Sequence, residues 1–409
     1  MLILGIVIVS QQLQGFNVRI KMYPAQNGDA FLLSTDRTNI LIDGGYSSTF
    51  NLYIQKDLEE LAARGACLNL VIITHIDADH IGGIIRFLAS NGDSNAKNII
   101  SIEDIWHNSL RSLTSVNQTA LPPEDLEVID AIIKRGHPKE FSTLPNFNEI
   151  SARQGSTLAT LIKAGGYVWN RADGTQSICT DSVQHKQFQD GLVRVLTPSR
   201  DRLNSLIKSW QQDLRRYGFT GPVSTNQAID DAFELNFEHN NKVQAKGESL
   251  ISAGCNKSLE EIYKPDNSQT NASSIATIIE LNGIRLLMLA DALAEDVLME
   301  IQRLKPQGEV MMFDAIKISH HGSNYNTSPE LLSVIDAPRY FISSDGSRHN
   351  HPDIELLRAI VDREASFTRT LYFNYSTPES REIRAFQTTT GATFIIEENA
   401  TGWIEITKE

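Results

Sequence analysis

Residues 75–80, with the sequence His-Ile-Asp-Ala-Asp-His, place two imidazoles and two carboxylates within six positions. Neighbouring carboxylates raise each other's pKa, whereas a divalent cation reverses that penalty by binding both. Because alternate side chains of an extended segment share a face, we expect His75, Asp77 and Asp79 to point together. His80 then begins a turn and could face a second ion. The stretch predicts a metal centre rather than a solvated acidic loop.

Apolar segments on both sides indicate how this stretch is held. The β-branched run Val71 to Thr74 is typical of a buried strand, and Ile84 to Leu88 continues with helical periodicity. Before the strand, Asn51 to Arg64 predicts an amphipathic helix. A strand, a helix and a strand with ligands at its carboxyl end together indicate an α/β fold.

Two later strands also end in residues that bind metals. The apolar run Ile284 to Ala290 ends in Asp291, whose two carboxylate oxygens could bridge two cations. The alternative for Asp291 is the N-cap of a helix predicted from Ala292 to Leu304. Another strand ends in His320 and His321. We expect one of the two, His320 by preference, to bind metal and the other to contact the substrate.

These motifs resemble those of the metallo-β-lactamase superfamily, whose usual signature is His-x-His-x-Asp-His. Asp77 replaces the second histidine, as in ComEC-like proteins, which comprise the hydrolase domain of a DNA-uptake channel and its free-standing relatives. Lys317-x-x-His-His-Gly-Ser looks very like the ComEC-like motif. The run that ends in Asp291 is similar to the family's Leu-Leu-Thr-Gly-Asp element, with Leu289 and Ala290 in place of Thr-Gly.

The resemblance implies one domain over residues 1–409, an αββα sandwich of the metallo-β-lactamase type. Insertions are expected at about 109–190 and 200–270. The resemblance also implies two ion sites. The expected ligands are Asp79, His80, Asp291 and His320 or His321 for one ion, and His75, Asp77 and Asp291 for a second ion that is held more weakly. In the family an aspartate matching Asp43 supports the metal loop, although a turn aspartate before glycines is an equal alternative.

The family's third histidine is missing at its usual place. It follows a strand like Leu192 to Leu196, after which Ser199 and Arg200 stand in this chain. His107 could supply that ligand, or it could cap a buried strand beside Trp106. A later His-Pro pair makes His351 a candidate for substrate contact or proton handling, with a loop histidine before a helix-starting proline as the alternative.

Together these residues predict a metal-dependent hydrolase with Asp79 and His351 as candidate catalytic residues. One or two divalent cations, Mn²⁺ or Zn²⁺, would lower the pKa of a bound water towards neutrality. Asp77 adds oxygen to the first site and favours Mn²⁺. The ComEC-like resemblance points to a phosphodiesterase or nuclease acting on DNA, RNA or a small nucleotide. The alternatives are a lactonase or amide or ester hydrolase, and a non-catalytic partner protein stabilised by metal.

The composition of the chain limits the binding partners that can be expected. The chain of 409 residues is 41% hydrophobic and 21% charged, as in folded globular proteins. Its net charge of -13 gives no overall attraction to nucleic acid or to an anionic membrane. A nucleic-acid substrate would therefore need a local basic groove or the metals themselves. The insertions could instead bind a protein partner.

The apolar run Leu2 to Val9 is shorter than the ~18 residues that span a bilayer, so we expect no membrane partner. It also lacks a basic flank and a small-residue cleavage site, which favours an added strand over a signal peptide. Cys67, Cys179 and Cys255 are odd in number and far apart. They indicate reduced thiols in a cytoplasm.

Overall fold

The computed structural model describes residues 17–114, 121–136, 157–221, 223, 228–235, 257–306, 308–348 and 350–408. Within these ranges, no helix has the length and apolar character needed to cross a bilayer. The predicted N-terminal strand lies outside the described residues, as does Cys255.

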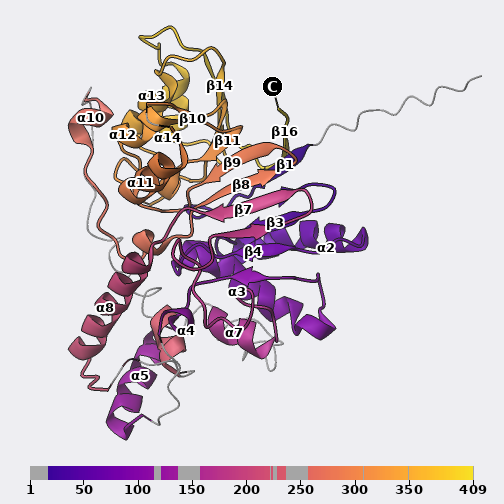
Figure 1. Ribbon diagram of the computed structural model, residues 1–409, viewed down its shortest axis with the longest axis vertical. Helices are drawn as coiled ribbons and strands as arrows, with labels where there is room; N and C mark the ends of the chain where they lie inside the picture. Colours follow the sequence, from indigo (N-terminus) through magenta and orange to yellow (C-terminus); the bar gives the residue numbers. More distant parts are fainter. Residues whose placement is uncertain are drawn as a thin grey trace, which may run out of the picture.

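Two β-sheets pack face to face at the centre of the molecule (Figure 1). In spatial order the first sheet contains β16 (Trp403–Ile406), β1 (Val18–Met22), β2 (Phe31–Ser34), β3 (Asn39–Ile42), β4 (Leu70–Ile72) and β5 (Ile105–Trp106). The second contains β15 (Phe394–Glu397), β14 (Arg369–Phe373), β13 (Arg339–Ile342), β11 (Ala315–Lys317), β9 (Ile284–Met288), β8 (Thr277–Leu281), β7 (Gly191–Val195) and β6 (His185–Gln187). A short parallel pair, β10 (Met311–Met312) and β12 (Ile335–Asp336), stands apart from both sheets.

The alternation of side chains along β2 shows how the layers are built. Phe31 and Leu33 enter the core between the two sheets, where Phe31 meets Phe341 of β13 edge to face. Leu32, which points the other way, packs under the helices of the first sheet. A strand that is buried on both faces explains why this segment is apolar at successive positions.

Helices cover the outer face of each sheet (Figure 1). The first sheet is covered by α1 (Ser47–Thr49), which continues through the helical turn Phe50–Ile54 into α2 (Gln55–Ala63), and by α3 (Ala78–Asn91) and α7 (Leu158–Ala164). The second sheet is covered by α10 (Leu259–Ile262), α11 (Ala294–Leu304), α12 (Pro329–Val334), α13 (Ile354–Val361) and α14 (Pro378–Arg384). Short 3-10 turns lie at Ser94–Ala96, Asn271–Ser273 and Ser319–Gly322. The αββα sandwich expected from the sequence is confirmed.

A further group of helices, here called the helical annex, extends from one end of the sandwich (Figure 1). It consists of α4 (Leu110–Leu113), α5 (Pro123–Gly136), α8 (Arg200–Arg216) and the helical residues 228–235. Trp210 and Phe233 lie in its apolar core, which also contains Ile76 of the metal-binding motif. The annex therefore packs directly against the loop that carries the candidate ligands, and its helices fall within the ranges expected to be insertions.

One predicted strand joins a different sheet. The sequence predicts strands at Thr370 to Phe373, Thr393 to Ile396 and Trp403 to Ile406 that complete the second sheet, and β14 and β15 do so. β16 instead pairs antiparallel with β1, with Val18 opposite Ile406, and becomes the edge of the first sheet. The prediction for Trp403 to Ile406 was wrong because the pattern within a strand does not specify which distant strand will pair with it.

Candidate metal centre

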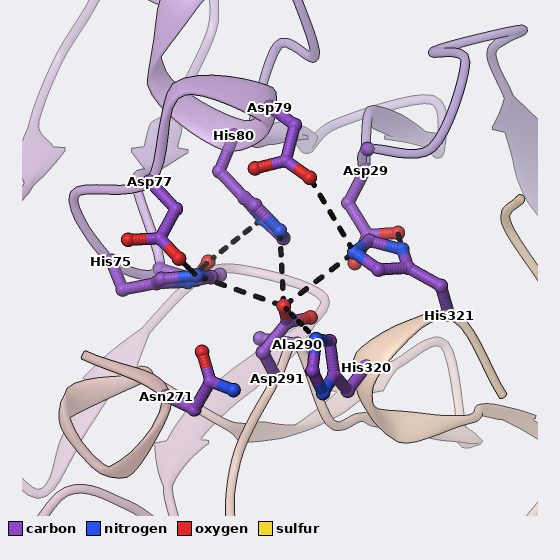
Figure 2. Close-up of polar contacts among 12 residues, drawn as sticks. Asp29, His75, Asp77, Asp79, His80, Asn271, Ala290, Asp291, His320 and His321 are labelled. Atoms are coloured by element: carbon purple, nitrogen blue, oxygen red, sulfur yellow. Dashed lines mark hydrogen bonds and ion pairs between the residues drawn. The ribbon is translucent and has the colours of Figure 1, made fainter. Parts of the chain in front are cut away.

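The predicted site residues come from separate elements and meet in one cluster (Figure 2). The motif that starts at His75 follows β4, Asp291 follows β9, and His320 and His321 follow β11. β9 and β11 are parallel neighbours, so their carboxyl ends reach the same edge of the sheet. All seven sequence-predicted metal residues are brought together: His75, Asp77, Asp79, His80, Asp291, His320 and His321.

The carboxylate of Asp291 lies at the centre of this cluster. Its Oδ2 lies 3.7 Å from Nε2 of His75, 3.4 Å from Nε2 of His80 and 3.5 Å from Nε2 of His321. These separations exceed a normal hydrogen bond. Two ligand atoms held tetrahedrally at about 2.1 Å from one cation lie about 3.4 Å apart. The spacing therefore suits cations between these atoms better than direct contact between the side chains.

Buried polar atoms without a hydrogen-bond partner also indicate a metal site. Within the described residues, several side-chain atoms that face the cluster have no hydrogen-bond partner: Nε2 of His75, His80 and His321, and Oδ1 of Asp77 and Asp291. Each buried polar atom left without a partner costs about 1–3 kcal/mol. A bound cation would take these nitrogen and oxygen atoms as ligands, so the residues present fit a divalent metal.

The donor atoms form two groups that share His80. Asp79, His80 and His321 each offer an atom within 4.8 Å of the others'. His75, His80 and Asp291 form another such group, and Asp77 adds an oxygen 3.6 Å from Nε2 of His75. The arrangement fits two neighbouring cations, the second with more oxygen ligands.

His80 is oriented by Asp43, the residue that follows β3. The His80 Nδ1–H donates to Oδ2 of Asp43 at 2.8 Å, while the backbone N–H and hydroxyl of Thr74 also donate to this carboxylate. Burial opposes charge on His80, but the carboxylates of Asp291 and Asp43 outweigh it and raise the pKa of the imidazole well above its usual value. The surroundings of His80 thus favour positive charge, and Asp43 supports the metal loop.

The other two buried imidazoles are also fixed through Nδ1. Nδ1 of His75 lies 3.0 Å from the Thr74 hydroxyl and 3.3 Å from the Ser274 hydroxyl. His321 donates from Nδ1 to the Ser343 carbonyl at 3.0 Å. In each ring this contact leaves Nε2 to face Asp291, as is usual for histidines that bind metals.

Asp79 is held from the other side by the turn between β1 and β2. The Asn27 amide donates to Oδ2 of Asp79 at 2.7 Å, and the Tyr46 hydroxyl donates to the Asn27 carbonyl oxygen at 3.1 Å. Gly28 makes this approach feasible, because a Cβ atom there would lie 2.0 Å from the backbone oxygen of Asp79. The turn and the metal loop therefore contact each other through backbone atoms.

Lys317 and Asp29 form a buried charge pair beneath the cluster, and sequence reasoning assigned no role in the site to either. The Lys317 ammonium pairs with Oδ2 of Asp29, donates to the Ala290 carbonyl at 2.8 Å and lies 3.8 Å from Oδ1 of Asp291. Burial raises the pKa of Asp29, but Lys317 and His321 outweigh it and leave the pKa at about 2. A lysine within an apolar strand was the available signal, since buried lysines are rare unless paired.

The geometry favours His321 over His320 as the partner of Asp79 and His80. Within the described residues, His320 belongs to no compact group of ligand atoms, and its Nε2 is 3.9 Å from Oδ2 of Asp291. Its Nδ1 donates to Asn326 at 2.7 Å, its side chain is 24% exposed, and burial lowers the pKa of its imidazole. The geometry therefore favours His321 as the ligand, whereas the sequence favours His320.

The metal loop is less extended than expected. Asp77 occupies the N-cap position of α3, which begins at Ala78, so Asp79 and His80 lie in its first turn. The expectation that His75, Asp77 and Asp79 alternate along an extended segment was wrong for Asp79. A carboxylate in a first helical turn is favoured by the positive end of the helix dipole, which explains why the helix starts so early.

The structure distinguishes between the two roles considered for Asp291, and between the two considered for His107. α11 begins at Ala294 with Leu293 as its N-cap, so Asp291 is not a helix cap. His107 is buried and donates from Nε2 to Glu234 of the annex at 2.8 Å. It therefore ends the short strand beside Trp106 rather than reaching the cluster.

The position where the family keeps its third histidine has a structural role in this chain. Ser199 is the N-cap of α8, and its hydroxyl accepts a hydrogen bond from the backbone N–H of Arg202. Of the two other histidines in the first expected insertion, His185 is exposed on β6 and His137 lies outside the described residues.

A pocket opens over the cluster. The described residues that line it are Asn27, Asp77, Asp79, Asp266, Ser268, Thr270, Asn271, Asp291, His320, His321, Ser344, Arg348 and His351. The rings of His351 and His320 lie 5.4 Å apart, and Nδ1 of His351 lies 3.5 Å from Asp353. His351 is thus placed on the wall of the pocket, next to the metal cluster.

Comparison with known proteins agrees with this geometry. The family model described as metallo-beta-lactamase superfamily matches residues 23–144, the part of the chain that includes β2 to β5 and the motif after β4. No curated protein matches the chain. Asp291 and the histidine pair after β11 lie beyond the matched residues and join the motif only in the folded structure. Residues 23–144 are therefore similar to the metallo-beta-lactamase superfamily, whose members are mostly metal-dependent hydrolases.

Proposed function

We propose that the protein is a metal-dependent phosphodiesterase that hydrolyses a nucleic acid or a small nucleotide. The observation that carries this proposal is the chemistry of the pocket wall. Every described side chain that lines the pocket is polar or charged. Pockets for lactones, β-lactams and other weakly polar esters present apolar surface to the ligand, as small-molecule sites generally do. A wall of amides, hydroxyls, imidazoles and carboxylates instead suits a substrate that is polar throughout, such as a nucleotide.

The donor set supports the same class of substrate. Asp77 and Asp291 provide oxygen to the group that contains His75, so this group is harder than an all-histidine site. Pairs of cations about 3.5–4 Å apart occur in phosphatases, nucleases and polymerases, and also in aminopeptidases. Bound divalent cations would supply an acidic water and neutralise charge that develops on the phosphoryl oxygens.

The side chains have distinct tasks in this proposal. His75, Asp77, Asp79, His80, Asp291 and His321 hold the cations. Asp43 and Asn27 orient His80 and Asp79 through their hydrogen bonds. His351 faces the pocket next to His320 and is our candidate for donating a proton to the leaving oxygen.

A panel of substrates tests the proposal. Purified protein, stripped of metal and supplied with Mn²⁺, Zn²⁺ or EDTA, is given bis-p-nitrophenyl phosphate, single- and double-stranded DNA, RNA, a lactone and a β-lactam. We expect cleavage of phosphodiesters, faster with Mn²⁺ than with Zn²⁺, and loss of cleavage in Asp79→Ala. Asp36→Ala, which changes an exposed aspartate in the turn between β2 and β3, is the matched control and should keep full activity.

Each other outcome points to a different function. Hydrolysis of the lactone or β-lactam without cleavage of phosphodiesters would replace the proposal with the acyl-hydrolase alternative. If no substrate is cleaved although the protein binds metal, the phosphodiesterase proposal fails. If the Asp79→Ala protein also keeps its cellular role, the result favours the alternative of a non-catalytic partner protein.

A further inference from the structure

One side chain of the pocket has a charge that the candidate metal centre does not use. Among the described residues that line the pocket, Arg348 is the only one with a guanidinium or ammonium group. It lies in the loop between β13 and α13, three residues before His351. A permanently charged group in a pocket wall is a strong candidate for recognition of an anion.

Arg348 is held on the side of the pocket where Asp79 lies. Its guanidinium carbon lies over the ring of Tyr46, 6.0 Å from the ring centre. The Tyr46 hydroxyl in turn donates to Asn27, whose amide donates to Asp79. Arg348 therefore lines the same pocket as Asp79 and His321 and is linked to Asp79 through Tyr46 and Asn27.

The loop that carries Arg348 is fixed at both ends. The Ser344 backbone N–H donates to the side chain of Asn374 at 2.9 Å, and its hydroxyl donates to the His351 carbonyl at 2.7 Å. Within the part of the chain that the structure describes, Arg348 forms no hydrogen bond and no ion pair with a carboxylate through its guanidinium. Its donors therefore remain available to a ligand while its backbone is held in place.

The balance of charge favours an anionic ligand. Four carboxylates line the described part of the pocket: Asp77, Asp79, Asp266 and Asp291. Two divalent cations would carry as many positive charges as these carboxylates carry negative ones. The positive charge of Arg348 would then have no counterpart in the pocket, and a guanidinium can bind two oxygens of one phosphate.

We propose that Arg348 forms an anion subsite beside the candidate metal centre and that the preferred substrate has a terminal phosphate next to its scissile diester. This inference rests on the proposed phosphodiesterase function and narrows it. The substrate class is a short nucleotide or a phosphorylated end of a nucleic acid, rather than the interior of a polymer.

Matched dinucleotides test the subsite. Three thymidine dinucleotides share one scissile diester and have no terminal phosphate, a 5′ phosphate or a 3′ phosphate. We expect one phosphorylated form to have a KM about tenfold lower than the unphosphorylated form, with kcat changed by less than about twofold. This preference should disappear in Arg348→Met and return in part in Arg348→Lys. Arg64→Met, which changes an exposed arginine at the end of α2, serves as the control.

The results separate this inference from the proposed function. Cleavage of all three dinucleotides with equal KM, or a preference that survives in Arg348→Met, would overturn the subsite and leave the phosphodiesterase proposal standing. If none is cleaved, the proposed function fails. Calorimetric measurement of the binding of the same dinucleotides then decides whether Arg348 forms an anion subsite. Tighter binding of a phosphorylated form that is lost in Arg348→Met then supports the subsite, and equal binding by wild type and variant overturns it.

Discussion

Asp43 and His80 are joined by a hydrogen bond of 2.8 Å between Oδ2 and Nδ1, and this bond turns Nε2 of His80 towards Asp291. Asp43 is fully buried and φ is 55° at this residue, a left-handed conformation that aspartate tolerates better than most residues. The contact links β3 to the metal loop and fixes which nitrogen of His80 is free to bind.

Asp43→Asn is expected to weaken metal binding without unfolding the protein. Asparagine keeps an acceptor for Thr74 but loses the charge that favours a cation at His80. Loss of such an outer partner typically lowers metal affinity by about 10–100-fold. Calorimetric titration with Mn²⁺ measures the effect. Asp57→Asn, which removes another buried carboxylate, one paired with Lys21 and Tyr23, should leave Mn²⁺ affinity unchanged. Equal Mn²⁺ affinity in both variants would show that Asp43 does not contribute to metal binding.

Lys317→Met is expected to make folding more dependent on metal. The substitution leaves Asp29 without its ammonium partner, and breaking a buried pair in this way costs about 3–5 kcal/mol. It also removes a positive charge that lies 3.8 Å from Asp291, so that a divalent cation relieves more repulsion than in the wild type.

Thermal unfolding with and without Mn²⁺ checks this prediction. The metal-free variant should unfold at a lower temperature than the metal-free wild type, and the rise on adding metal should be larger in the variant. A rise no larger than that of the wild type would show that Lys317 does not interact electrostatically with the metal site.

Ala290→Gly is expected to leave stability unchanged or to raise it slightly. The φ angle of Ala290 is 49°, and a non-glycine residue in this left-handed region costs about 1–2 kcal/mol. Glycine removes that cost but adds freedom to the unfolded chain, worth about 0.4–1 kcal/mol. Ala89→Gly in the interior of α3 is the control and should lower stability by about 1 kcal/mol. If chemical denaturation gives the same loss for both variants, Ala290 is not strained.

The annex gives a prediction about pH. Burial and the neighbouring charge of Glu234 raise the pKa of Asp230 to about 8, so this carboxyl keeps its proton in the folded state at pH values where the unfolded chain has lost it. The stabilisation that results is complete below about pH 4, the pKa of this carboxyl in the unfolded chain. It is lost as pH rises towards 8.

Urea unfolding between pH 5.5 and 8.5 tests the role of Asp230. The free energy of unfolding should fall with rising pH, with a contribution from this group of at most about 1.4 kcal/mol per pH unit. Asp230→Asn mimics the protonated acid and should flatten the slope. Parallel curves for wild type and variant would mean that Asp230 is ionised in the folded protein.

Much of the fold followed from local patterns in the sequence. The apolar run Ile284 to Ala290 predicted β9, which begins at Ile284 and ends two residues earlier, at Met288. The helix predicted from Ala292 to Leu304 is α11, which begins two residues later and ends at Leu304. These elements were predictable because periodicity and end signals act within a few residues of one another.

The parts that the sequence did not predict depend on long-range contacts. The partner of His107 is Glu234, 127 residues away, and β16 pairs with a strand at the opposite end of the described chain. The choice between His320 and His321 depends on backbone angles of the turn after β11, where φ is positive at both residues. Lys317 and Asp29 became part of the site only when two sheets brought them together.

The most direct test of the account is the rate of bis-p-nitrophenyl phosphate hydrolysis as metal-free protein is titrated with Mn²⁺, with bound metal counted in the same samples. We predict that the rate rises with bound metal up to about two ions per chain. Asp291→Asn should bind less metal and stay at least about a hundredfold slower while keeping its fold by circular dichroism. Full activity in metal-free protein, or in Asp291→Asn, would contradict the assignment of this cluster as the catalytic centre.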